Sequence, residues 1–287
     1  MVIEQALTEG TRIIRESGAG ETPLLDASLL LCHTLDITRV QLYTRGKETL
    51  SPDQKRRFLS LVEKRKNHVP VAYLTNTREF YNRDFYINED VLIPRGDTEI
   101  LVETSLELLD KAGNRDRTVL DMCTGSGCVG ITIALENSDS WVTLSDISTK
   151  ALKVAQTNIS RLKASNATCI ESDLFESMKE RRFSLICANP PYIAPQWYEQ
   201  CSLQVKREPQ LALIDDSPDG LDIIRKIIRQ SPLHLHTNGY LVIECDYRQI
   251  GEAMRLLREE GFCEITAHRD LGDRQRVVSG RYSCTRN

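Results

Sequence analysis

The sequence has no apolar run that approaches the roughly 20 residues a helix needs to cross a bilayer. Residues 1–17 are amphipathic and lack the basic start and the apolar core of a secretory signal, so we expect a cytoplasmic protein. Internal repeats and low-complexity stretches are also absent. Its 40% hydrophobic and 27% charged residues are typical of a globular protein with a substantial core.

None of the nine cysteines is spaced as Cys-x-x-Cys, the pattern of many zinc and redox sites. We therefore expect reduced thiols that mainly fill the core, and no metal site. Positive charge is not in excess either, because the formal net charge is −4. This balance gives no global field for gripping a nucleic-acid backbone, although a local basic patch stays open.

Helical periodicity dominates residues 1–75, where apolar residues recur at spacings of three and four. Aromatic and β-branched residues over 76–95 then indicate a short hairpin that joins two domains. We predict a helical domain at 1–75, a hairpin linker at 76–95 and a larger domain at 96–287.

Two helix starts in the first domain carry capping signals. Thr22 and Ser51 each precede a proline, which places a capping hydroxyl just before the first helical position. Gln54, three residues after Ser51, predicts a capping box there.

Strand and helix patterns alternate after a predicted helix at 97–112. Alternation of this kind builds a parallel sheet with helices on both faces, because parallel neighbours need crossover connections. A short polar loop joins the last two strands, so we expect that pair to be antiparallel. The predicted strands are 119–121, 141–146, 168–171, 183–188, 239–244, 262–267 and 275–280.

A strand, a glycine-bearing turn and a helix start follow one another over residues 119–136. Gly125 and Gly127 let backbone N–H groups approach a ligand at the helix N-terminus, where partial positive charge favours carboxylate or phosphate. The turn therefore predicts a site for an anionic or polar cofactor. Dinucleotide-binding folds share this pattern, and a plain tight turn is the alternative.

Acidic residues follow the next two predicted strands. Asp146 ends the second strand, where a carboxylate can accept hydrogen bonds from both hydroxyls of a ribose. Asp173 follows the third strand and is placed to accept from an adenine amino group, with Leu174 packing beside the ring. Both indicate an adenosine-containing cofactor, whereas a capped turn at Asp146 and a helix cap at Asp173 are the alternatives.

The fourth predicted strand runs directly into Asn189, Pro190, Pro191 and Tyr192. Ligands of open α/β sheets bind beyond the carboxyl ends of the strands, so this tetrapeptide is expected to face the same crevice as the glycine turn. The Asn189 side-chain oxygen and the Pro190 carbonyl can each accept one N–H of a planar amide or amine, while Tyr192 packs against its flat face. This arrangement predicts methyl transfer to such a nitrogen by proximity and alignment.

A structural alternative exists for the same tetrapeptide. It is a proline-rich strand exit, in which Asn189 caps a turn and Tyr192 belongs to the core. The position of the tetrapeptide after a strand of the same sheet favours the functional interpretation.

The motifs together resemble the protein-(glutamine-N5) methyltransferases that modify peptide chain release factors, and the resemblance covers most of the chain. It implies a seven-stranded class I (Rossmann-like) S-adenosylmethionine-dependent methyltransferase domain with a small N-terminal helical domain that helps dock the release factor. The matching segments are VLIPRGDTEILVE at 91–103, DMCTGSG at 121–127, SDIS at 145–148, SDLF at 172–175, NPPYI at 189–193, EPQLAL at 208–213, DGL at 219–221 and DLGDRQRVV at 270–278.

The resemblance also implies the substrate and the cofactor. The substrate is the glutamine of the Gly-Gly-Gln tripeptide in release factors, and S-adenosylmethionine is converted to S-adenosylhomocysteine. Carried over by position, Asn189, Pro190, Pro191 and Tyr192 hold this glutamine. The positions implied to contact the cofactor are Cys123, Thr124, Gly125, Ser126, Gly127, Asp146, Leu174 and Asn189.

Two positions depart from the pattern of the family. Cys123 stands where the first glycine of the loop is usual, and Gly96 replaces the usual proline after Arg95. A cysteine is tolerated at position 123 if the backbone there does not need a positive φ angle. Arg95, Glu99, Glu208 and Glu244 receive no role from the sequence; for Arg95, lining the crevice and forming an ion pair are both open.

Three rival functions follow from the same motifs. An adenine-N6 methyltransferase of DNA or RNA needs a basic target-recognition region, which is not visible. A glutamine methyltransferase of a ribosomal protein shares the core motifs and would differ mainly in the N-terminal domain. An interaction module without activity predicts a damaged substrate motif, yet all four residues from Asn189 to Tyr192 are present.

Overall fold

The computed structural model describes residues 1–112, 117–270 and 272–283. Two compact units divide the chain: one comprises Met1–Thr77 and Ser202–Arg207, and the other comprises Arg78–Cys201 and Glu208–Asn287. Within the described ranges, no helix is both long enough and apolar enough to cross a membrane.

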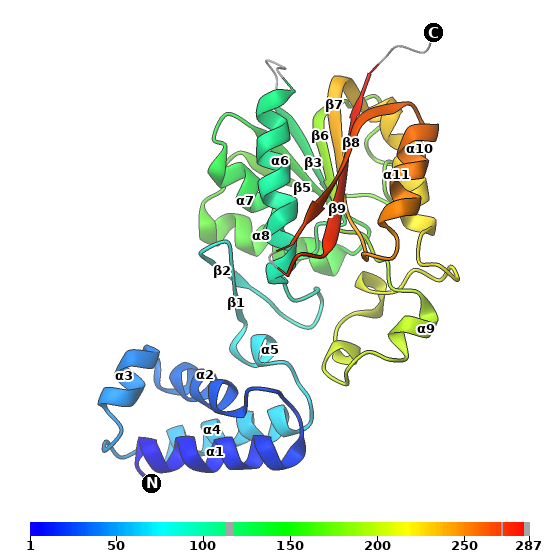
Figure 1. Ribbon diagram of the computed structural model, residues 1–287. Helices are drawn as coiled ribbons and strands as arrows, with labels where there is room; N and C mark the ends of the chain where they lie inside the picture. The colour runs from blue at the N-terminus through cyan, green and yellow to red at the C-terminus, as the bar shows by residue number, and fades with distance from the viewer. Residues whose placement is uncertain (113–116, 271, 284–287) are drawn as a thin grey trace. The chain divides into compact units, whose positions relative to one another are not determined.

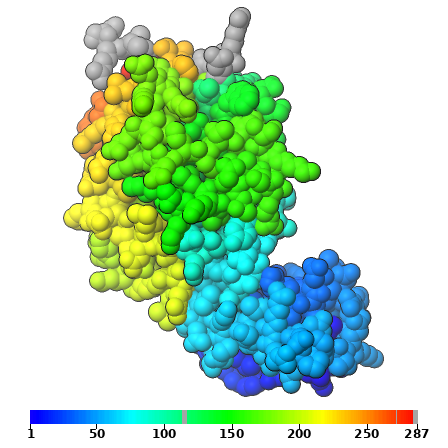
Figure 2. All heavy atoms as spheres, turned by 180° about the vertical axis from the view of Figure 1, so that it is seen from behind, coloured from blue at the N-terminus to red at the C-terminus, as the bar shows by residue number. Residues whose placement is uncertain are grey.

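The first unit is helical, as the periodicity of its sequence predicts, and its residues 1–77 are among the blue to cyan spheres of Figure 2. Its core is built from one apolar face of each longer helix, including Ile14, Leu30 and Phe58, which are fully buried. The helices are α1 (Ile3–Ser17), α2 (Pro23–Leu35), α3 (Arg39–Thr44), α4 (Pro52–Lys66) and α5 (Val71–Thr75).

One of the two predicted caps is confirmed. Ser51 Oγ accepts the Gln54 N–H and Gln54 Oε1 accepts the Ser51 N–H, which completes the capping box of α4. At Thr22 the predicted helix start is confirmed, because α2 begins at Pro23, but the predicted capping role of the hydroxyl is wrong, since the Thr22 side chain makes no capping hydrogen bond. Its backbone (φ −124°, ψ 63°) departs from the extended conformation of an N-cap residue, and its hydroxyl lies 3.5 Å from the Asp26 carboxylate instead.

Hydrogen bonds tie the two segments of the helical unit together. Arg65 Nε donates to Asp26 Oδ2 at 2.7 Å, and Arg65 Nη2 donates to Gln204 Oε1 at 3.0 Å. Arg207 Nη2 donates to the Asn67 carbonyl at 3.1 Å. These bonds hold Ser202–Arg207 in the helical unit, which the local sequence pattern does not predict.

The second unit contains the hairpin strand β2 (Arg83–Tyr86), which pairs with β1 (Thr77–Phe80), and a seven-stranded sheet of order β5-β4-β3-β6-β7-β9-β8. Strands β3 to β7 run parallel, and β9 is antiparallel to β7 and to β8. The strands are β3 (Thr118–Met122), β4 (Trp141–Asp146), β5 (Ala167–Glu171), β6 (Phe183–Ala188), β7 (Leu235–Glu244), β8 (Phe262–Arg269) and β9 (Gln275–Tyr282).

This topology confirms the predicted α/β class and the antiparallel final pair. The largest difference is β7, which begins at Leu235 rather than at 239 because Leu235 already pairs with Phe183 of β6, while Thr237 and Asn238 are exposed. The helix predicted at 97–112 begins as a 3-10 turn (η1, Gly96–Thr98) and continues as α6 (Glu99–Lys111).

Helices cover both faces of the sheet (Figure 1). Helices α6, α7 (Cys128–Glu136) and α8 (Thr149–Leu162) lie on one face, and α10 (Asp222–His234) and α11 (Ile250–Glu259) lie on the other. The connection after β6 holds three short helices: α9 (Pro195–Tyr198), η2 (Val205–Arg207) and η3 (Gln210–Ala212).

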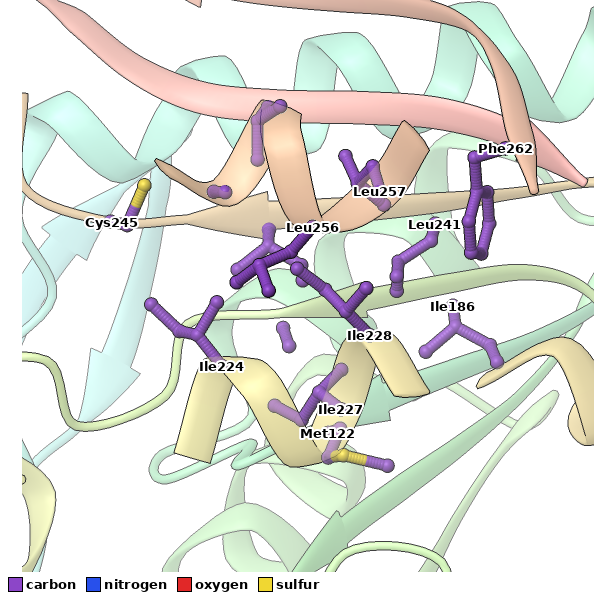
Figure 3. Packing of buried hydrophobic residues seen from close by; sticks show 14 of the residues in the cluster. Met122, Ile186, Ile224, Ile227, Ile228, Leu241, Cys245, Leu256, Leu257 and Phe262 are labelled. Carbon is purple, nitrogen blue, oxygen red and sulfur yellow. The ribbon is translucent and has the colours of Figure 1, made fainter. Parts of the chain in front are cut away.

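Apolar side chains lock α10 and α11 onto the sheet, as Figure 3 shows. Ile224, Ile227 and Ile228 of α10 pack with Met122 of β3 and Ile186 of β6, and all five are buried. Because helices cover both faces of the parallel strands, these strands have nearly continuous apolar sequences. Since the strands are parallel, their carboxyl ends lie at one edge of the sheet.

Candidate active site

A cavity of about 900 Å³ lies at the carboxyl ends of the parallel strands, with all of its lining residues in the second unit. It brings together loops that follow β3, β4, β5 and β6, which are distant in sequence. The predicted site residues among its lining are Cys123, Thr124, Gly125, Ser126, Asp146, Asp173, Leu174, Asn189 and Pro191.

Three predicted site residues do not line this cavity: Gly127, Pro190 and Tyr192. Pro190 is buried. The Tyr192 ring packs against the core cluster around β6 and β7, and its hydroxyl donates to Glu244 Oε1 at 3.3 Å. The catalytic and substrate roles of Pro190 and Tyr192 therefore stay predictions, and for Tyr192 the structure adds a packing role.

The two glycines of the turn do different things. Both have positive φ angles, 54° at Gly125 and 82° at Gly127. A Cβ atom built on Gly125 meets nothing within 4 Å, whereas one built on Gly127 comes within 2.7 Å of Ile131 Cδ1 and 3.0 Å of Leu144 Cδ2. Gly125 thus leaves open space on the cavity side, and Gly127 allows the helix to pack closely on β4.

Cys123 also adopts a left-handed backbone conformation, with φ 57°. The condition under which a cysteine replaces the usual glycine without strain is therefore not met, and a non-glycine residue in this region costs on the order of 1 kcal/mol. Burial and the carboxylates of Asp146, Asp121 and Asp173 raise the pKa of the Cys123 thiol well above its usual value. The neutral thiol is consequently a wall of the cavity and not a nucleophile.

Asp121, at the end of β3, is a site residue that the sequence did not single out. Its Oδ2 accepts hydrogen bonds from the Thr124 hydroxyl and from the Gly130 N–H, the latter at 2.9 Å, while the Cys187 thiol lies 3.8 Å from Oδ1. Burial raises the pKa of Asp121 to about 6. Its position directly before the glycine turn was the signal that could have found it.

Asp146 braces the glycine turn from β4. Its Oδ2 accepts the Gly125 N–H and its Oδ1 accepts the Ser148 N–H, both at 2.9 Å. Burial raises the pKa of Asp146, and these N–H donors lower it. Each carboxylate oxygen has further lone-pair capacity toward the cavity, so the capped turn and a ligand contact are compatible.

Asn189 leaves β6 half-buried and turned toward the cavity. Its Nδ2 donates to the Thr98 hydroxyl oxygen over a long 3.5 Å. Because the NH2 group is engaged on this side, Oδ1 remains as an acceptor for a ligand. Thr98 is buried, lines the cavity and was not identified from the sequence.

Arg95 both lines the cavity and forms an ion pair, the two alternatives that its sequence position allowed. Its guanidinium donates to Glu208 Oε1, and it lines the cavity. Glu208 is buried and its Oε2 also accepts the Ile93 N–H at 3.0 Å, so it anchors the segment before α6 to the connection after β6. Among the described residues, no group of three His, Cys, Asp or Glu side chains is placed to hold a metal ion.

The order of the strands and the cavity at the carboxyl ends of the parallel strands define the Rossmann-like fold of S-adenosylmethionine-dependent methyltransferases. Residues 97–205 match the model described as the methyltransferase small domain. A solved T. Thermophilus 16S rRNA N2 G1207 methyltransferase, in complex with AdoMet and guanosine, shares this fold at a TM-score of 0.53 and 17% identity. The likeness covers 72% of this chain and 49% of that chain.

Closer relatives narrow the class to a family. A release factor glutamine methyltransferase of Neisseria gonorrhoeae is 38% identical over 92% of this chain and 96% of its own length. One of Xylella fastidiosa (strain 9a5c) is 39% identical over 90% of this chain and 92% of its own length. Residues 5–75 match the model described as the PrmC N-terminal domain. The chain therefore belongs to the release factor glutamine methyltransferase family, which confirms the resemblance seen in its motifs.

The two glycines of the turn predict different stability effects. Gly127→Ala should lower the free energy of unfolding by about 2–4 kcal/mol, because it adds both strain and a clash with Ile131. Gly125→Ala, which adds strain alone, should cost about 1 kcal/mol. Urea unfolding of both variants measures the difference, and equal losses would contradict the packing role of Gly127.

The left-handed backbone at position 123 predicts which of two variants at this position is the more stable. Cys123→Gly should be more stable than Cys123→Ala by about 1 kcal/mol, because both remove the thiol but only glycine removes the strain. The comparison uses the midpoints of urea unfolding. An alanine variant as stable as the glycine variant would show that position 123 is unstrained.

Proposed function

We propose that this protein transfers a methyl group from S-adenosylmethionine to the side-chain amide nitrogen of the glutamine in the Gly-Gly-Gln tripeptide of peptide chain release factors. It thereby supports translation termination, and acts in the cytoplasm. The observation that carries the proposal is Asn189, whose amide is held by Thr98 so that its oxygen is left for the cavity that the glycine turn also lines. Membership of the release factor glutamine methyltransferase family supports the substrate class.

The chemistry of an amide nitrogen explains why acceptors matter. Its lone pair is delocalised into the carbonyl, so the NH2 group must be oriented toward the methyl donor. In the proposal, Asn189 Oδ1 and the Pro190 carbonyl each accept one N–H of the glutamine. Pro190 and Pro191 fix the backbone, so the two acceptors are preorganised.

When bound, the cofactor would supply an electrophilic methyl group on a sulfonium sulfur, and transfer of that group to the amide nitrogen would leave S-adenosylhomocysteine and release one proton to solvent. The contribution of the protein is proximity, alignment and exclusion of water. In the proposal, Tyr192 packs against the flat face of the glutamine amide.

The lining of the cavity fits an adenosine cofactor with an amino-acid tail. The loop from Cys123 to Gly127 approaches the tail, Asp146 accepts the ribose hydroxyls, and Asp173 and Leu174 meet the adenine. The open space beside Gly125 and the carboxylate of Asp146 at the cavity wall support this assignment. Asp121, whose Oδ1 makes no stronger contact than a thiol, adds an acceptor for the ammonium group of the tail.

The helical unit is proposed to help dock the release factor. The predicted division into a docking domain at 1–75, a hairpin linker at 76–95 and a catalytic domain at 96–287 belongs to this proposal. The match of residues 5–75 to the PrmC N-terminal domain supports it.

The class of substrate is tested by measuring which macromolecule receives the labelled methyl group. The purified protein is incubated with methyl-labelled S-adenosylmethionine and, separately, with a release factor, ribosomal proteins or DNA. We expect label in the release factor, and its loss when the tripeptide glutamine of that factor is changed to alanine. Label confined to DNA would favour the adenine-N6 methyltransferase, and label confined to ribosomal protein would favour the other glutamine methyltransferase.

Two variants separate cofactor binding from transfer. Asn189→Ala should lower kcat by about a hundredfold or more, because one preorganised acceptor is lost.

Asp146→Ala should instead raise the Kd for S-adenosylmethionine about tenfold or more. Asp146→Asn keeps one acceptor oxygen and should therefore raise this Kd by a smaller factor. Calorimetry and steady-state kinetics measure both. Normal turnover in Asn189→Ala, or normal affinity in Asp146→Ala, would remove that residue from its role.

A further inference from the structure

Glu244 is a buried carboxyl group behind the substrate tetrapeptide, and nothing in the proposed chemistry uses it. It is the last residue of β7 and is 2% exposed. Strand β7 pairs in parallel with β6, with Ile243 opposite Ala188, so the next residues are Glu244 and Asn189. The register therefore places this carboxyl group beside the start of the tetrapeptide.

One hydrogen bond and one close approach connect Glu244 to the tetrapeptide. The Tyr192 hydroxyl donates to Glu244 Oε1 at 3.3 Å. The nearby Thr98 hydroxyl lowers the pKa of Glu244, while Glu244 Oε2 has no hydrogen-bond partner among the described residues. The same Thr98 oxygen accepts from Asn189 Nδ2. Thr98 thus stands between the buried carboxyl group and the Asn189 amide.

The charges around Glu244 do not hold it ionised. Arg276 is the nearby cation, but it is shared among the carboxylates of Asp97, Asp246 and Asp270 at 3.9, 3.8 and 3.3 Å. Burial raises the pKa of Glu244 to about 7; Thr98, Tyr192 and Arg276 lower it, and Asp97 raises it further. The thiols of Cys128 on α7 and Cys245 after β7 also interact with Glu244.

We propose that Glu244 is a positioning residue whose ionised form, acting through Thr98 and Tyr192, keeps the Asn189 side-chain oxygen turned toward the substrate amide. The inference rests on the proposed function for the identity of that amide. It adds a protonation-dependent orientation of the acceptor, which is separate from binding of the cofactor because Glu244 does not line the cavity.

The direction of the hydrogen bonds gives the mechanism. An ionised Glu244 can only accept, so the Thr98 proton points to it and the Thr98 oxygen accepts the Asn189 NH2. A protonated Glu244 can donate to Thr98, whose own proton is then free to point at Asn189. The Asn189 amide would turn its oxygen to Thr98 and its NH2 to the cavity, where it would oppose the N–H groups of the glutamine.

The first test is the pH dependence of kcat. Wild type should gain activity as the pH rises through about 7, the pKa of Glu244. Glu244→Gln should be at least about tenfold slower and lack this rise, with a Kd for S-adenosylmethionine within about twofold of wild type. Thr98→Val should be slow, and Thr98→Ser should restore turnover. Tyr192→Phe should move the midpoint to higher pH, because it removes a hydrogen bond that lowers the pKa of Glu244.

A second test needs neither cofactor nor substrate. The pKa of Glu244 is raised from 4.5 to about 7 on folding, so the stability that its protonated form contributes is present at low pH and lost as the pH rises toward 7. The midpoint of thermal unfolding of Glu244→Gln should therefore rise relative to wild type between pH 5 and pH 8, and Glu9→Gln, at an exposed helical position, should show no such trend. Asp121 titrates in both proteins and cancels in the comparison.

The two tests separate this inference from the proposed function. A difference in unfolding midpoint that stays constant with pH, or a Glu244→Gln enzyme with the kcat and pH profile of wild type, would overturn the positioning role. Failure of wild type to methylate the release factor at any pH would overturn the proposed function instead.

Discussion

The site depends on the parallel, in-register pairing of β6 with β3 on one side and β7 on the other. Asp121 lies opposite Cys187, and Ala188 lies opposite both Met122 and Ile243. This register sets the glycine turn, the Asn189 tetrapeptide and Glu244 at one edge. A slip of one residue would turn every side chain to the other face of the sheet, so the apolar packing of α10 and α11 on these strands also fixes the site.

Buried carboxyl groups are the electrostatic cost of this arrangement. Asp121 lies near the end of β3 and Glu244 at the end of β7, on either side of β6, and burial raises the pKa of each. One oxygen of Asp121 accepts from Thr124 of the glycine turn and Gly130 of α7, whereas Glu244 Oε2 has no hydrogen-bond partner among the described residues. Groups of this kind are retained where a site needs acceptors in fixed positions, at some expense of stability.

Much of the fold could be predicted from the sequence because its signals are local. Strands β4 and β6 have the predicted ends, since an apolar run stops at a polar loop in each. The place of Ser202–Arg207 in the helical unit and the roles of Thr98 and Glu244 could not be predicted, because they depend on partners far apart in the chain. Gln204, for example, meets Arg65 across 139 positions. The strain at Cys123 was missed for another reason: a motif gives residue types but not the φ angle.

In the proposed function, one side-chain nitrogen of a protein substrate accepts the methyl group. Tandem mass spectrometry of a release factor after reaction with this protein and S-adenosylmethionine tests that claim most directly. We predict a single added methyl group on the side-chain amide of the tripeptide glutamine. A methyl group on any other residue, or an unmodified glutamine after complete reaction, would contradict the account.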